Sequence, residues 1–313
     1  MALKAIRWAI GALLLACSVS SAAPLPVVYL DRVVAIGRIE TAGPNLGHWV
    51  GEASGFIFGE FLQKVDATTS NYQLFLITNR HVIDEHLKAT SGPLSVRLNP
   101  KGMGSVQQYD FPLTLGGQPT WQAHPDPLID IAAVALNAGV LGQLGVKFDF
   151  FRSESDSLSR VKAKDLGLTE GYGVFVLGFP MALVGTQQDY VIVREGSIAR
   201  VRDTLDFPER AKSFLIDSFI FPGNSGGPVV LKPENPINQF PGEKVPISSA
   251  YLLGIVKGYL PYTDIAISPQ TQHVRVTFEE NSGLTEVIPA DYIEETIQAA
   301  FKLGVAPRPP GWK

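Results

Sequence analysis

Short apolar runs recur along most of the chain, and Gly, Pro, Asn or Asp separate them. Runs of about four to eight residues that are rich in Val, Ile, Leu and Phe predict β-strands rather than helices. Six such runs fall in each half of the sequence, which indicates two similar β units. The first six are expected at residues 33–36, 54–58, 73–78, 95–98, 111–115 and 131–136. The second six are expected at residues 174–177, 190–201, 214–220, 228–231, 251–256 and 273–278.

Two segments differ from this pattern. Residues 137–166 mix Gly, Ser and charges, so we expect the connection between the units there and assign residues 141–166 as the linker. The units themselves then cover residues 23–140 and 167–288. The loop at 232–249 is rich in Pro and Asn and is longer than a hairpin needs, and its role stays open.

The end of the chain has a helical period. Ile293, Ile297 and Phe301 recur every four residues, acidic residues come early, and Lys302 comes late. Gly304 and Pro307 follow and would stop the helix. We therefore predict a terminal helix within residues 289–304, with one face packed on the second β unit and a short tail at 305–313.

The N-terminus is typical of a secretory signal. Lys4 and Arg7 precede an apolar run at 8–16 that is too short to span a bilayer, and small residues follow. Cleavage before Ala23 would give a signal peptide of residues 1–22. A lipoprotein signal of residues 1–16, which would leave an acylated Cys17, is the alternative. We expect an exported protein, either periplasmic or extracellular, or tethered to a membrane through Cys17.

Composition limits the other classes of function. The chain has 313 residues, of which 45% are hydrophobic and 18% charged, as in a globular protein with a core. Its net charge is −4, and without the basic residues of the signal 24 basic residues face 30 acidic ones, a net charge of −6. This balance disfavours nucleic-acid binding. Cys17 is the single cysteine, so an intramolecular disulfide is excluded.

The segment at 217–228 carries the strongest chemical signal. Ser225 lies between Gly223 and the pair Gly226 and Gly227. Glycines permit a tight turn that exposes the serine hydroxyl and lets neighbouring amide groups converge. The turn therefore suits a nucleophile beside an oxyanion hole.

A serine nucleophile needs a base, and the base needs a group that orients it. His81 follows a run at 74–78 that is apolar enough for a buried strand, and Asp130 directly precedes another at 131–136. A carboxylate at the mouth of a buried strand needs a partner. Each residue alone could be structural: a surface histidine, a turn aspartate and a serine in a glycine-rich loop. Their order, His, Asp and Ser, is the order of one class of triad enzymes.

These motifs resemble the trypsin-like (chymotrypsin-fold) serine proteases, and among them the bacterial high-temperature-requirement (Htr) branch. The resemblance covers nearly all of the chain after the signal. It is carried by Ser54-Gly55-Phe56-Ile57, Thr78-Asn79-Arg80-His81-Val82, Asp130-Ile131-Ala132, Gly178-Phe179-Pro180, Asp217 to Pro228, Gly254-Ile255 and Asn281-Ser282-Gly283-Leu284.

The resemblance implies an all-β fold of two six-stranded antiparallel β-barrels with the active site between them. It implies His81 as general base, Asp130 as its orienting partner and Ser225 as nucleophile. The amides of Gly223 and Ser225 would form the oxyanion hole. The activity implied is hydrolysis of peptide bonds in protein or peptide substrates through an acyl-enzyme, with no cofactor.

Two departures refine the resemblance. Digestive relatives carry an aspartate before the nucleophile that pairs with a new N-terminus after zymogen cleavage, whereas this chain has Asn224. An amide cannot form that ion pair. Htr proteases also usually append a peptide-binding PDZ domain, but only eleven residues follow Lys302. We therefore expect a bare protease domain.

The resemblance also implies where a substrate side chain binds. Phe219 would lie at the base of the primary pocket, with Ile255, Val256 and Lys257 as its wall. A bulky apolar base would leave a substrate Arg or Lys unpaired, so we expect an apolar residue before the scissile bond. In the other interpretation, Phe219 turns into the barrel core.

The two histidines His81 and His86 lie close together in the sequence, with two acidic residues between them. His81 and His86 with the acids between them do not form a metal site, because residues five apart on a helix point to different sides and further ligands are missing. A solvated turn is expected there instead.

A relative that only binds proteins and an esterase with the same triad are the alternative functions. The sequence does not indicate the oligomeric state.

Overall fold

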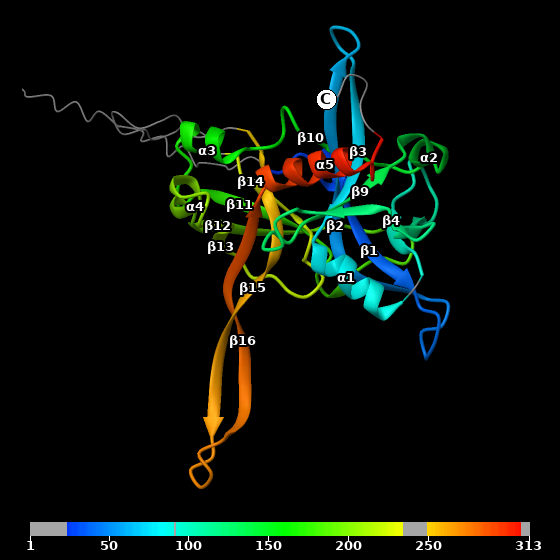
Figure 1. Ribbon diagram of the computed structural model, residues 1–313. Coiled ribbons are helices and arrows are strands. Elements are labelled where there is room, and N and C mark those ends of the chain that lie inside the picture. Colours follow the sequence, from blue (N-terminus) through cyan, green and yellow to red (C-terminus); the bar gives the residue numbers. More distant parts are fainter. Residues whose placement is uncertain (1–23, 91, 234–248, 308–313) are drawn as a thin grey trace, which may run out of the picture.

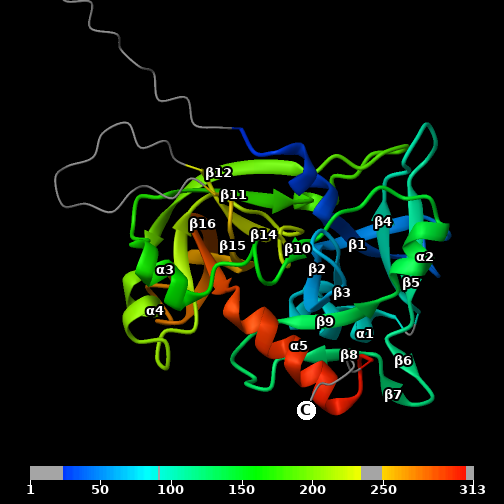
Figure 2. The ribbon, with the colours of Figure 1, turned by 90° about the horizontal axis from the view of Figure 1, so that it is seen from above.

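Two antiparallel β units make up most of the structure, a computed structural model that describes residues 24–90, 92–233 and 249–307 (Figures 1 and 2). The predicted signal, Cys17, nearly all of the 232–249 loop and the last residues of the tail lie outside the described residues. Each of the twelve predicted runs has a strand at its position.

The first unit is an eight-stranded sheet in the order β5-β4-β1-β2-β3-β9-β8, with β10 paired in parallel to β2. No pairing joins β5 to β8 within the described residues, so the sheet curls as a half-barrel. Its strands are β1 (Val33–Ile39), β2 (Trp49–Lys64), β3 (Ser70–Thr78), β4 (Leu94–Leu98), β5 (Gln107–Phe111), β8 (Trp121–Ala123), β9 (Ala132–Leu136) and β10 (Phe151–Arg152). A separate two-stranded sheet consists of β6 (Thr114–Leu115) and β7 (Gln118–Pro119).

The second unit is a closed barrel of six antiparallel strands in the order β11-β12-β13-β16-β15-β14. Closure leaves no free edge within the barrel. Its strands are β11 (Gly173–Gly178), β12 (Ile192–Arg200), β13 (Phe214–Asp217), β14 (Pro228–Leu231), β15 (Leu252–Ile267) and β16 (Val274–Pro289). The all-β fold class with a C-terminal helix is confirmed.

Strands β15 and β16 continue far beyond the barrel as a two-stranded hairpin (Figure 1). We call residues 260–282 the β arm. Each strand is 16 residues long, although the sequence predicted only short strands at 251–256 and 273–278. The barrel parts are buried, whereas the arm is exposed along almost its whole length.

Short helices connect the strands: α1 (Arg80–Ala89), α2 (Ala138–Gln143), α3 (Arg160–Leu166), α4 (Arg202–Asp206) and the 3₁₀ helices η1 (Val27–Arg32) and η2 (Pro180–Ala182). The terminal helix α5 (Asp291–Leu303) begins with acidic residues and ends at Gly304, which has a φ of 74°. Glycine accepts this left-handed conformation without strain.

The expectation that α5 packs on the second unit is incomplete, because the helix also packs on the first unit. Its buried side chains belong to a cluster that includes the first sheet, and the ring of Phe301 lies 5.7 Å from that of Phe75 in β3. In Figure 2 the helix runs beside β8 and β9. The half-barrel is open and offers an apolar surface to cover, whereas the second barrel is closed on itself. The same cluster includes Phe175 and Ile255, so the two units share a core.

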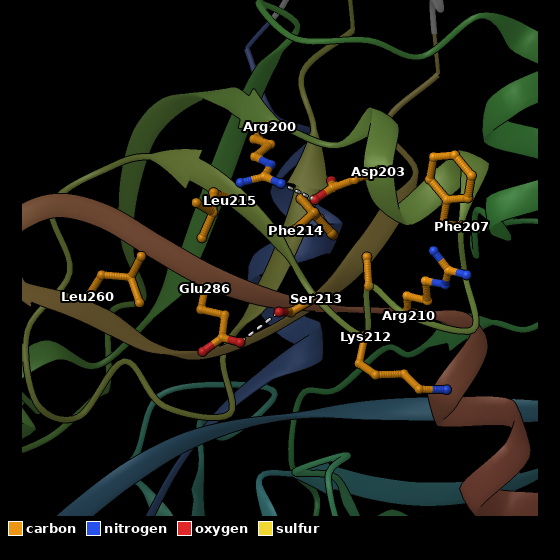
Figure 3. A pocket seen from close by; sticks show the side chains of 11 residues that line it. Arg200, Asp203, Phe207, Arg210, Lys212, Ser213, Phe214, Leu215, Leu260 and Glu286 are labelled. Carbon is orange, nitrogen blue, oxygen red and sulfur yellow. Dashed lines mark hydrogen bonds and ion pairs between the residues drawn. The ribbon is translucent and has the colours of Figure 1, made fainter.

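A cavity of about 520 Å³ opens on the outside of the second barrel (Figure 3). Arg200 pairs with Asp203 at 2.8 Å, and Ser213 donates to Glu286 at 2.6 Å. Phe207 also lines this cavity, which contains none of the residues that the sequence singled out.

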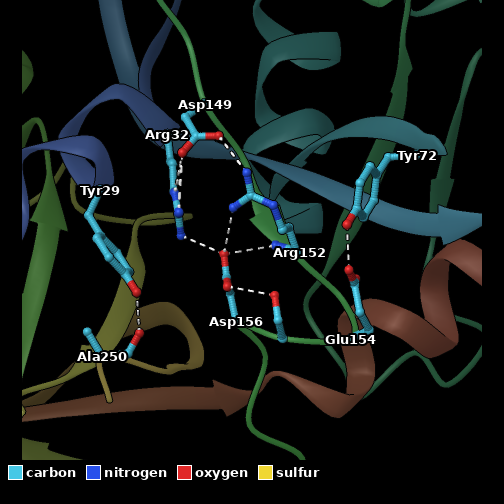
Figure 4. A network of polar contacts seen from close by, with 9 residues as sticks. Tyr29, Arg32, Tyr72, Asp149, Arg152, Glu154, Asp156 and Ala250 are labelled. Atoms are coloured by element: carbon cyan, nitrogen blue, oxygen red, sulfur yellow. Dashed lines mark hydrogen bonds and ion pairs between the residues drawn. The ribbon is translucent and has the colours of Figure 1, made fainter. Parts of the chain in front are cut away.

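A buried arginine holds the connection between the units in place (Figure 4). Arg32 is only 4% exposed, and its guanidinium lies 2.9 Å from Asp156 and 3.2 Å from Asp149. Tyr29 stacks on it at 4.2 Å and donates its hydroxyl to the carbonyl of Ala250, just before β15. Buried charges need such partners. These contacts join η1, the connection and the second barrel.

Candidate active site

Strand pairing brings His81 and Asp130 together. Thr78 at the end of β3 pairs with Ala132 at the start of β9. His81 follows β3 and lies in the first turn of α1, and Asp130 precedes β9. In an antiparallel pair the end of one strand lies beside the start of the other, so both residues reach the same edge.

The two side chains form a close pair. His81 Nδ1 lies 2.6 Å from Asp130 Oδ2, and the backbone N–H of His81 donates to Asp130 Oδ1 at 2.9 Å. The side-chain amide of Asn79 donates to the Asp130 carbonyl at 2.8 Å. Both carboxylate oxygens are therefore used, and the ring is oriented with Nε2 directed away from the carboxylate.

The pair shifts the pKa of both residues. Burial lowers the pKa of His81, but the hydrogen bond and charge of Asp130, helped by Glu85 and Asp84, outweigh it and raise that pKa above its ordinary 6.5. Burial raises the pKa of Asp130, but the hydrogen bond and charge of His81 prevail and lower it below 3.8. The geometry thus stabilises an imidazolium beside a carboxylate.

The turn around Ser225 depends on its glycines. Gly226 has a φ of 82°, and a Cβ there would lie 2.2 Å from the carbonyl oxygen of Ser54. The turn is closed by a bond from the Gly227 N–H to the Asn224 carbonyl at 2.9 Å. The Gly226 N–H donates to the backbone carbonyl of Val256 at 3.0 Å. No larger residue fits position 226 without displacing the first sheet.

Ser54 of β2 joins this turn to the first unit. Its hydroxyl donates to the Gly223 carbonyl at 2.6 Å and accepts from the Phe179 N–H at 2.8 Å. Its backbone N–H donates to the Ser225 carbonyl at 2.9 Å. We call these three contacts the Ser54 bridge. The sequence marked Ser54 only as part of a resembling motif and did not indicate this contact.

The peptide between Pro222 and Gly223 has a defined direction. The Pro222 carbonyl accepts from the Met181 N–H at 2.6 Å. In a trans peptide the N–H points opposite to the carbonyl, so the Gly223 N–H is directed away from Met181. Two backbone donors of this turn, the N–H of Gly223 and the N–H of Ser225 itself, lack an acceptor in the described structure.

His81 and Ser225 line one cavity of about 350 Å³ between the units. The Ser225 hydroxyl donates to the Lys257 carbonyl at 3.5 Å, a weak contact. A direct bond to His81 is absent from the contacts of the described residues. Catalytic hydrogen bonds are often long in unliganded sites. The rest of the wall consists of Arg38, Glu52, Val82, Glu85, His86, Ala89, Pro222 and Gly223.

Asn224 is completely buried beside Ser225. Its Oδ1 accepts from the Phe221 N–H at 3.0 Å, whereas its Nδ2 has no partner within the described chain. The side chain is neutral, so it supports the turn by a hydrogen bond rather than by an ion pair.

The four residues predicted to form a substrate pocket differ from one another in exposure and in their contacts. Phe219 is 54% exposed, and its ring lies over Gly283, at 3.4 Å from where a Cβ would stand. Ile255 and Val256 are buried in the hydrophobic cores, so only their backbone is available to a pocket. Lys257 is partly exposed and pairs with Glu286 at 3.0 Å. Phe219 thus lies outside the core.

His86, five residues after His81, has structural contacts. His86 is buried, with Nδ1 2.9 Å from Glu52 and Nε2 3.2 Å from the Gly92 carbonyl. The segment expected as a solvated turn is instead α1, whose Val82, Ile83 and His86 are buried. Among the described residues no group of three His, Cys, Asp or Glu side chains is suited to hold a metal ion.

Comparison with known proteins gives one family. The family model of the trypsin-like peptidase domain matches residues 53–235, which is more than half of the chain. The chain belongs to this family. A search of curated proteins gave no match. Of the helices in the described ranges, none has both the length and the apolar character needed to cross a membrane.

Proposed function

We propose that this member of the trypsin-like peptidase family is a serine endopeptidase with the triad His81, Asp130 and Ser225. The observation that carries the proposal is the 2.6 Å contact between His81 Nδ1 and Asp130 Oδ2 in the wall of the cavity that Ser225 also lines. A protein that only binds in this cavity has no need of a histidine with a raised pKa beside a serine.

In the proposed reaction, the Ser225 oxygen forms a bond to the carbonyl carbon of the substrate and its proton moves to His81 Nε2. The carbonyl π electrons move to the oxygen. When this tetrahedral intermediate collapses, the carbon–nitrogen bond breaks and His81 returns the proton to the leaving amine. Water then attacks the acyl-enzyme with His81 again as base, which releases the acid and restores Ser225.

Two features support the stabilisation of the intermediates. Asp130 holds the proton-bearing Nδ1 of His81 and stabilises the cation that forms. The free N–H groups of Gly223 and Ser225 are available to the developing oxyanion, and each such donor lowers the barrier by about 3 kcal/mol in enzymes of this type. The mechanism requires no cofactor.

The substrate would be a protein or peptide with an apolar residue before the scissile bond. This preference rests on the resemblance, which assigns Phe219 to the base of the pocket, because an apolar surface cannot pair a desolvated Arg or Lys. Phe219 is exposed but is not among the residues that line the cavity of His81 and Ser225. We further propose a relation to the Htr branch of this family. Export to the periplasm or outside, or a lipid anchor at Cys17, follows from the N-terminal pattern alone.

A fluorophosphonate probe tests the proposal. The unaltered chain should be labelled, Ser225→Ala should not, and Ser105→Ala, an exposed serine outside the cavity, should be labelled like the unaltered chain. Labelling that survives in Ser225→Ala, or that is absent from all three, would overturn the nucleophile. Cleavage of casein against hydrolysis of a simple ester then separates a protease from an esterase.

A further inference from the structure

The β arm exposes an unusual amount of apolar surface. Along it, large apolar side chains are 37–61% exposed: Leu260, Tyr262, Ile265, Ile267, Val274, Val276 and Phe278. An isolated two-stranded hairpin is marginally stable in water. Apolar surface that is gathered on one projecting element marks a contact with another protein.

Pairing within the arm determines which side chains share a face. Ala266 pairs with Val276, and Asp264 pairs with Phe278. Paired residues of antiparallel strands point to the same side, and the next residues point to the other. Val276 and Phe278 therefore lie on one face with Ala266, whereas Thr277 and Glu279 lie on the other.

The two edges of the arm differ. The β15 edge carries Pro261, which has no N–H for a further strand. The β16 edge has no proline in residues 274–282. In the described structure β13 pairs only with Leu284 to Val287, so this edge is unpaired beyond the barrel. Of the two, β16 is the edge that can accept another strand.

The sequence of this edge is complementary to itself. If two copies of β16 run antiparallel with Thr277 opposite Thr277, then Arg275 of each copy lies opposite Glu279 of the other, and Val276 lies opposite Phe278. Opposite charges, an aromatic beside a β-branched residue and Thr beside Thr are the cross-strand pairs that stabilise sheets. Arg275 has no partner residue on β15, because the register of the pairing shifts there, between the pairs Ala266–Val276 and Ile267–Val274. Neither Arg275 nor Glu279 forms an ion pair within the part of the chain that is described.

We propose that the β arm is a dimerisation element, in which β16 of one copy pairs antiparallel with β16 of a second copy about a two-fold axis through Thr277. The contact is the same on both copies, so it closes as a dimer and leaves no unpaired β16 edge. The result is a four-stranded sheet in which Val276 and Phe278 of both copies form one apolar face.

The first test is the mass of the whole chain in solution. Sedimentation of the Ser225→Ala chain avoids self-digestion, and a reductant excludes a disulfide through Cys17. A reversible dimer at micromolar concentrations is expected. A monomer throughout that range would overturn the proposal. Because this measurement needs no activity, it is independent of the proposed protease function.

Charge reversal tests the register. Arg275→Glu places two acids opposite each other, and Glu279→Arg places two arginines opposite each other. Each variant should therefore dimerise at least tenfold more weakly. An equimolar mixture of the two should dimerise like the unaltered chain, because every pair is again of opposite charge. Glu280→Arg, whose position faces Val274 of the other copy, is the matched control and should retain the dimer.

Two outcomes would contradict this register. One is a dimer that Arg275→Glu leaves intact. The other is a pair of folded monomeric variants that do not combine when they are mixed. Circular dichroism spectra equal to that of Glu280→Arg establish that both variants are folded.

Discussion

The two β units supply different kinds of group to the cavity between them. The half-barrel contributes side chains, His81 and Asp130, which the pairing of β3 with β9 places at one edge. The closed barrel contributes a backbone turn, whose glycines direct Ser225 and two N–H groups. The first part depends on charge and therefore on pH. The turn of the closed barrel depends on the small volume of its glycines. It should therefore be insensitive to pH but should not accommodate an added methyl group.

Asp130→Asn should have the largest effect, because it removes the charge from the half-barrel's pair. The amide nitrogen of asparagine cannot accept a hydrogen bond from His81 Nδ1–H. The imidazole ring therefore no longer has a partner that fixes the tautomer with the proton on Nδ1. We expect kcat for a peptide substrate to fall on the order of 10⁴-fold. Asp126→Asn, on the preceding turn, is the matched control. A loss of less than tenfold would show that Asp130 does not orient the base.

Gly226→Ala tests the closed barrel's part with a single methyl group. Its Cβ would lie 2.2 Å from the Ser54 carbonyl oxygen and require a φ of 82° from alanine. We expect the free energy of unfolding to fall by roughly 1–3 kcal/mol from backbone strain alone, and kcat/KM to fall with it. Urea unfolding and peptide hydrolysis measure the two quantities. Gly102→Ala, which meets nothing within 4 Å, should change neither.

The pH dependence separates activity from stability at the same pair. His81 acts as a base only when neutral, so kcat/KM should fall as pH drops through a pKa above 6.5. Its contribution to stability runs the other way: a raised pKa stabilises the fold fully below pH 6.5, and this is lost as pH rises through the folded-state pKa. Asp130 has a lowered pKa, so its contribution to the stability of the fold is present above pH 3.8. This contribution is lost as the pH falls through the folded-state pKa of Asp130.

The smallest effect in this comparison is expected from Glu85→Gln in α1. Glu85 is exposed and helps to raise the pKa of His81, so its removal should move the acid limb of kcat/KM slightly toward lower pH. Glu209→Gln, an exposed residue after β12, should leave the limb in place. A limb that moves toward higher pH in Glu85→Gln would contradict the assigned direction.

The sequence anticipated most of the strands, because buried strands need continuous apolar runs. It did not predict α1, because Asp84 and Glu85 interrupt the apolar pattern of the buried positions Val82, Ile83 and His86. The period of α5 indicated which of its residues are buried but not the surface that covers them. Of the β arm, the sequence predicted the strand at 273–278 but not the partner strand or the length of the hairpin, because an exposed hairpin needs no continuous apolar run.

The candidate site shows the same limit. Spacing and order pointed to His81, Asp130 and Ser225 before any geometry was known, because turn glycines and strand ends are local signals. The Ser54 bridge joins segments separated by more than a hundred residues, and no local pattern reports it. The side-chain directions of Ile255 and Val256 likewise depend on the register of the closed barrel.

The Ser54 bridge also has a consequence for the newly made chain. The carbonyl of Gly223 and the N–H of Phe179 have their common partner, Ser54, in β2, so the turn around Ser225 is complete only after the two units have docked. A chain with one folded half contains either a base without a serine or a serine without a base. Under the proposed triad mechanism, such a chain cannot cleave its neighbours before both units have folded and docked.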